Sequence, residues 1–128
     1  MGAVEYLERI KKIDAMIANR KEEYARWFGI AEGMGGFSSS DGVQSSKNPQ
    51  KMSDAVGRYI EIEQEIKALQ AERDDIIKTI EQLPAVDYDL LFKSFVNGYS
   101  LKEIARYFDR SYDWARKRKR TALDHLQR

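Results

Sequence analysis

The sequence predicts an all-α protein, with two long amphipathic helices followed by a C-terminal group of short helices. Apolar residues recur at alternating spacings of three and four along two stretches, 3–28 and 51–83, and this spacing places them on one helix face. Charged residues make up 34% of the chain and apolar residues 42%, which suits long exposed helices better than a thick globular core. Glycine and proline are few outside the segment 29–50, so little else interrupts helix formation.

The two long stretches each carry an apolar stripe with one arginine in it. The stripe of the first helix consists of Tyr6, Ile10, Ile13, Ile17, Tyr24 and Trp27. The stripe of the second consists of Ala55, Tyr59, Ile62, Ile66, Leu69, Ile76, Ile80 and Leu83. Either Ser53 caps the second helix or Met52 begins it. Arg20 and Arg73 stand at the positions where the three-and-four spacing of each stripe would place an apolar residue. A polar residue at such a step fixes register or oligomer state, or its side chain reaches out past the edge of the seam.

The segment 29–50 is rich in glycine and serine and is predicted to be a loop between two antiparallel helices. It is either a flexible linker or a segment that orders on a partner or on DNA. A helical hairpin of this kind, resembling a coiled coil, has only a thin core of its own. A second hairpin would bury its remaining apolar edges, as in a four-helix bundle. We therefore expect residues 3–83 to form a homo-oligomer, with a dimer favoured.

The region 84–128 has the sequence form of a helix-turn-helix. Pro84 ends the second long helix and is expected in the first turn of the next, which Asn97-Gly98 closes. Ser100 and Glu103 have the spacing of a capping box, and Ser111 is a plausible cap for the last helix. Two capped helices about ten residues apart, the second of them basic, are typical of this motif. We accordingly divide the chain into a hairpin region, 1–83, and a helix-turn-helix domain, 84–128.

These residues resemble region 4 of sigma-70-type RNA polymerase subunits, the region that recognises the −35 promoter element. The resemblance lies in Leu83-Pro84, Leu90-Leu91, Phe95-Val96, Gly98 to Leu101, Glu103 to Ala105, Phe108, Ser111 and Ala122 to Leu126. With a helical hairpin in front and Gly-Val-Gln-Ser-Ser at 42–46, the whole chain is similar to small phage and prophage regulators grouped near the ArpU and RinA activators. The resemblance implies a transcriptional regulator, an activator of late genes, in the cytoplasm of a bacterial host. It also implies RNA polymerase as a possible partner.

Positive charge is concentrated at the C-terminal end, although the whole chain carries only +1. Residues 111–128 hold six basic and two acidic side chains, a net +4, so the rest of the chain carries −3. Arg116, Lys117 and Arg120 project together when 111–126 is drawn as a helix, opposite the face that holds Ala115 and Ala122. A basic helix end on an otherwise acidic chain indicates a local contact with a polyanion.

We predict double-stranded DNA as that polyanion, read in its major groove. The N-terminal half of a recognition helix usually meets the bases. The base-reading candidates are therefore Tyr112, Asp113, Arg116 and Lys117. The phosphate candidates are Ser100, Lys102, Ser111, Arg118, Lys119 and Arg120. The alternative for the basic run is a solvated charged face or a localisation-type patch.

Other chemistry has little support in the sequence. The chain has no cysteine and one histidine, His125, so we expect no disulfide, no metal site and no cofactor. No Ser-His-Asp or paired-carboxylate arrangement stands out, and we do not expect an enzyme. No apolar run approaches the roughly 20 residues of a membrane span, and the N-terminus lacks the form of a signal peptide. We therefore expect a cytoplasmic protein without a membrane partner.

Two other functions fit the same features. A small-terminase-like DNA-packaging protein of a phage also joins a helix-turn-helix to an oligomerising helical hairpin, and it would form a closed ring on a packaging site. A protein-interaction adaptor would contact RNA polymerase or another regulator through the hairpin, and its basic helix would bind an acidic protein surface. DNA affinity that is insensitive to loss of Arg116 and Arg120 would favour the adaptor.

Overall fold

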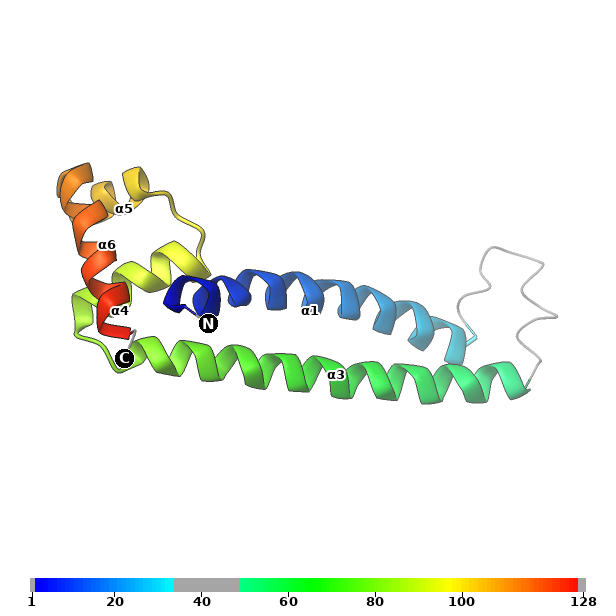
Figure 1. The fold of residues 1–128 in the computed structure, drawn as a ribbon. Helices are drawn as coiled ribbons and strands as arrows, with labels where there is room; N and C mark the ends of the chain where they lie inside the picture. Colours follow the sequence, from blue (N-terminus) through cyan, green and yellow to red (C-terminus); the bar gives the residue numbers. More distant parts are fainter. Residues whose placement is uncertain (1, 34–48, 127–128) are drawn as a thin grey trace. The chain divides into compact units, whose positions relative to one another are not determined.

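A computed structural model describes residues 2–33 and 49–126 of the chain, and these residues are helical with no β-strand among them (Figure 1). The elements are α1 (Ala3–Ala31), α3 (Pro49–Glu81), α4 (Ala85–Leu91), the π-helical turn η3 (Phe92–Val96), α5 (Leu101–Phe108) and α6 (Tyr112–Leu126). The prediction of an all-α protein is confirmed. The chain divides into two compact units, one made of residues 1–14 with 71–128 and the other of residues 15–70.

The ends of the helices differ from the predicted bounds at four places, one of which is the end of α3 at Glu81 and not at residue 83. The first helix was expected to end at residue 28, but α1 continues to Ala31, and Gly33 follows it with a left-handed φ of 78°. The helix α3 begins at Pro49, so Ser53 lies inside its first turns and is not its N-cap. Proline is well tolerated at a helix start, where its missing N–H has no intrahelical partner to lose. Pro84 is the N-cap residue of α4, outside the first turn, with φ −54° and ψ 153°.

In the unit of residues 15–70, α1 and α3 meet through apolar and aromatic side chains. Ile17, Ala55 and Ile62 are buried. The ring of Tyr59 meets those of Tyr24 and Phe28 edge-on, with centroids 5.4 Å and 5.2 Å apart. The predicted stripe therefore packs against the partner helix here, with its aromatic members half-buried.

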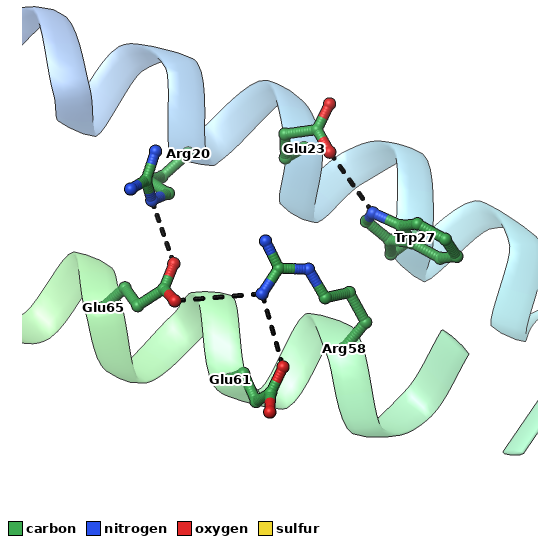
Figure 2. Close-up of polar contacts among 6 residues, drawn as sticks. All are labelled: Arg20, Glu23, Trp27, Arg58, Glu61 and Glu65. Carbon is green, nitrogen blue, oxygen red and sulfur yellow. Dashed lines mark hydrogen bonds and ion pairs between the residues drawn. The ribbon is translucent and has the colours of Figure 1, made fainter. Parts of the chain in front are cut away.

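The seam arginine of this unit is held by a carboxylate on the facing helix (Figure 2). The Nε of Arg20 donates to Oε1 of Glu65 at 2.9 Å, and Nη1 of Arg58 lies 3.8 Å from the other oxygen of Glu65. Arg58 also donates to Glu61 at 3.3 Å. Glu65 thus lies between two guanidinium groups, one from each helix. Because only one register brings Arg20 opposite Glu65, the pair favours that alignment of the helices.

In the other unit, the first turns of α1 pack on the last turns of α3. Their buried residues are Ala3, Leu7, Ile10, Ile13, Ile76 and Ile80. The second seam arginine, Arg73, donates through Nε to Oδ1 of Asp14 at 2.6 Å. Arg9 pairs with Glu72, and its hydrogen bond lowers the pKa of that carboxyl. The side chains of Arg20 and Arg73 therefore extend past the edge of the apolar stripe, and each pairs with an acid on the other helix.

Candidate nucleic-acid interface

The helix α4 and the turn η3 form the support for the two helices that follow. Leu90 and Leu91 of α4 are fully buried, and α4 packs against both η3 and α6. The sequence predicted a regular helix up to Asn97, but the last five residues before it form a π-helical turn, in which the Asn97 N–H donates to the Phe92 carbonyl at 3.1 Å. Gly98 then takes a left-handed φ of 77°, as predicted, and closes the helix.

The helix α5 begins with the predicted capping box. The Ser100 hydroxyl accepts from the Glu103 N–H at 3.2 Å, and Glu103 Oε1 accepts from the Ser100 N–H at 2.8 Å. The bond from the Ser100 N–H, followed by that from its hydroxyl, lowers the pKa of Glu103. Ser100 is thereby occupied as a cap, although its side chain remains exposed. Lys102, another phosphate candidate, lies exposed in the first turn of α5.

The turn between α5 and α6 changes the chain direction within three residues. Asp109 takes a left-handed conformation with φ 57° and ψ 48°, which ends α5. Aspartate tolerates this conformation better than most residues because its short polar side chain can bond locally. Ser111 then accepts from the Trp114 N–H at 3.0 Å, which confirms it as the cap of α6. Residues 99–126 therefore form two separate helices that pack on each other.

The inner side of α6 is lined with small residues. Ala115 and Ala122 are fully buried, one on each side of the basic run, and α6 packs there against α4 and α5. Leu123 and Leu126 are half-buried. On α5, Ile104 and Ala105 are buried. The predicted inward face of the basic helix thus agrees with the structure.

A buried carboxylate, Asp87, connects α4 to the basic helix. Its side chain is 0% exposed. Its Oδ1 accepts from Nε of Arg118 at 2.6 Å, and its Oδ2 lies 3.3 Å from Nδ1 of His125. Asp87 was not among the predicted site residues, although it stands three and four positions before Leu90 and Leu91 and therefore shares their buried face. Arg118, predicted as a phosphate contact, instead donates its charged hydrogen bond to this buried carboxylate.

The outer side of α6 carries exposed cations. Arg116, Lys117 and Arg120 are all exposed, as predicted for one flank of the helix. Asp113 lies among them: Nη2 of Arg116 donates to its Oδ1 at 2.8 Å, and Nζ of Lys117 lies 3.2 Å from its Oδ2. These two bonds, that from Arg116 first, lower the pKa of Asp113. The acid is therefore ionised at neutral pH and holds two of the predicted base-reading cations on the same surface.

The remaining candidates lie at the edges of this flank. Tyr112 begins α6 and is 53% exposed. Lys119 is half-buried, with its Nζ 5.0 Å from the centre of the Phe95 ring. We define the cationic flank as Arg116, Lys117 and Arg120 with the acid Asp113 among them.

Comparisons of this chain with models of known families, with curated proteins and with solved structures gave no match. Within residues 2–33 and 49–126, no group of three or more His, Asp or Glu side chains is placed to hold a metal ion. Over the same residues, no helix combines the length and apolar character that crossing a bilayer requires.

Proposed function

We propose that this protein binds double-stranded DNA in a sequence-dependent way through a helix-turn-helix formed by α5 and α6. The observation that carries the proposal is the cationic flank, which is exposed on one side of a helix whose other side is buried. An α-helix fits the major groove of B-DNA, and arginine there can donate two hydrogen bonds to guanine O6 and N7. In this arrangement α6 is the recognition helix and α5 lies across the backbone.

The contacts behind α6 support this role. A recognition helix must present its side chains in a fixed orientation, because a bidentate contact tolerates little rotation. The buried Ala115 and Ala122 bring α6 close to its neighbours, and the bond from Arg118 to Asp87 resists rotation about the helix axis. The basic run therefore divides by role: Arg118 anchors the helix and the cationic flank meets the nucleic acid.

The biological class follows from the resemblance to sigma region 4. We place the protein among phage and prophage transcriptional regulators, acting in a bacterial host as an activator of late genes. RNA polymerase is the partner that such a role requires. No observation on the described residues favours the packaging or adaptor alternative over this reading.

A selection from random duplexes tests the proposal directly. The purified full-length chain should enrich a defined sequence and should bind it more tightly than random DNA at about 150 mM salt. Failure to enrich any sequence, together with affinity that does not change when Arg116 and Arg120 are both replaced by alanine, would contradict DNA binding by α6. A closed ring of many subunits bound at one site would instead favour the packaging protein.

Arg120 is the cation of the flank best placed for a phosphate, because no carboxylate of the described residues lies within ion-pair distance of it. Arg120→Ala should weaken specific and random DNA to a similar extent and flatten the plot of log affinity against log salt by about one unit. Lys12→Ala, which removes an exposed cation from α1, is the matched control and should leave the slope unchanged. An unchanged slope for Arg120→Ala would remove this residue from the phosphate contacts.

We further propose that residues 3–83 form an antiparallel hairpin that dimerises. The contacts within each unit support it, because partners run in opposite order along α1 and α3. In the unit of residues 15–70, Arg20 pairs with Glu65, whereas Tyr24 meets Tyr59. In the other unit, Tyr6 meets Thr79, whereas Asp14 pairs with Arg73. In the unit of residues 15–70, a shallow groove exposes apolar surface, and Val56 and Ile60 of α3 are also exposed. The groove is lined by Lys21, Tyr24, Glu63, Ile66, Lys67 and Gln70.

Light scattering at micromolar concentration should therefore report about twice the 14.9 kDa mass of one chain. Ile66→Glu should shift the protein toward the monomer, because it places a charge where a second hairpin would bury apolar surface. Lys67→Glu changes a charge at the rim of the same groove and serves as the control. A monomer at that concentration for the unaltered chain would refute the dimer and leave DNA binding by α6 untouched.

A further inference from the structure

The acid of the cationic flank is placed where it affects both affinity and sequence preference. Asp113 is exposed in the first turn of α6, the part of a recognition helix that approaches the bases. Its two carboxylate oxygens bind different cations, Arg116 at 2.8 Å and Lys117 at 3.2 Å.

These contacts compete with DNA for the same donors. A phosphate oxygen and the Asp113 carboxylate both accept hydrogen bonds from Arg116 and Lys117, and both are negative. When α6 approaches DNA of any sequence, Asp113 either retains its cations or loses them and faces a polyanion without a partner. Either outcome weakens binding to random DNA.

A suitable base pair removes this conflict. In the major groove a G·C pair presents the N4 amino donor of cytosine beside the O6 and N7 acceptors of guanine. In the protein, the Asp113 carboxylate is an acceptor and the Arg116 guanidinium beside it is a group of donors. The pair is therefore complementary to the cytosine donor and the guanine acceptors. The carboxylate then gains a donor from cytosine, and Arg116 remains next to it while donating to guanine.

We propose that Asp113 is a specificity-determining residue that accepts a hydrogen bond from a cytosine amino group and holds Arg116 and Lys117 away from DNA that lacks it. This inference rests on the proposed DNA binding by α6. It predicts that the carboxylate raises the ratio of specific to random affinity mainly by lowering the affinity for random DNA.

The experiment compares the unaltered chain with Asp113→Asn and Asp113→Ala, using duplex selection and salt-dependent affinity on the selected site and on random DNA. Asp113→Asn should bind random DNA about tenfold more tightly, with a salt slope steeper by about two units, because Arg116 and Lys117 are both released to contact phosphates. Its selected sequence should lose cytosine at one position and gain adenine there, since asparagine pairs with adenine N6 and N7. Asp113→Ala should lose the preference at that position without gaining another.

Asp124→Asn is the matched control, because it removes the same charge from an exposed position near the other end of α6. An equal gain in random affinity for Asp124→Asn would reduce the effect to net charge and overturn the inference. Selected sequences that are identical for the unaltered chain and both Asp113 variants would also overturn it, while DNA binding by α6 would stand. If the unaltered chain selects no sequence at all, both proposals are overturned. Thermal unfolding monitored by circular dichroism confirms that each variant is folded.

Discussion

Replacing Arg118 with alanine is expected to lower the free energy of unfolding by about 2–3 kcal/mol, a large effect for a side chain that is partly exposed. The reason lies in its partner: Asp87 is fully buried, and the 2.6 Å bond from Arg118 is its shorter contact. Without the guanidinium, a carboxylate stays in the protein interior, and its remaining side-chain partner among the described residues is His125 at 3.3 Å. The expected loss is placed below the usual range for a buried pair because Arg118 itself is 37% exposed to solvent.

Chemical denaturation followed by circular dichroism measures this loss. The double variant Arg118→Ala with Asp87→Ala should be more stable than Arg118→Ala alone, because it removes the unpaired charge together with its former partner. Lys117→Ala, one position away on the exposed side of α6, should change the stability by no more than about 0.5 kcal/mol. If Arg118→Ala and Lys117→Ala unfold at the same denaturant concentration, Asp87 does not anchor the helix.

Replacing Arg116 with alanine is expected to cost about 1–3 kcal/mol of binding free energy on the selected DNA site, a loss of roughly tenfold to more than a hundredfold. Arg116 is exposed on the flank of α6 and is held by Asp113 in its first turn. A guanidinium in that position can donate two hydrogen bonds to one guanine, and alanine can donate none. The loss on random DNA should be much smaller.

Arg116→Lys provides a control that keeps the charge and removes the planar pair of donors. It should retain most of the affinity for random DNA and lose most of the preference for the selected site. Titrations of each variant with the selected and the random duplex, at several salt concentrations, separate the two effects. An equal loss on both duplexes for Arg116→Ala would show that Arg116 contacts the backbone and not a base.

The local signals were the most predictable part of the fold. The Ser100 and Ser111 caps and the left-handed Gly98 follow from chemistry within a few residues, and each is present. The exposure of Arg116 and Arg120 followed from the 100° step of an α-helix alone. Such features need no knowledge of which distant segments meet.

The features that were missed depend on distant contacts or on small energy differences. Asp87 and Arg118 are 31 positions apart, and neither residue type in isolation indicates a buried pair. The π-helical turn before Asn97 and the left-handed Asp109 are local, but many sequences of the same composition form a regular helix or a glycine turn instead. The packing of α4 against α6 was therefore needed to show that Arg118 pairs with Asp87, whereas its neighbours in the basic run do not.

The small side chains on the inward face of α6 have a consequence for how a new preference for a DNA target would arise under the proposed function. Because Ala115 and Ala122 already fill the space against the neighbouring helices, the outward positions 112, 113, 116 and 117 bear little of the packing. Mutations can accumulate at those four positions without unfolding the protein, while bulkier residues at the two alanines would push the helices apart. Under the proposed DNA binding by α6, the same scaffold can thus diversify its choice of DNA target over evolutionary time, or in a laboratory library randomised at those four codons.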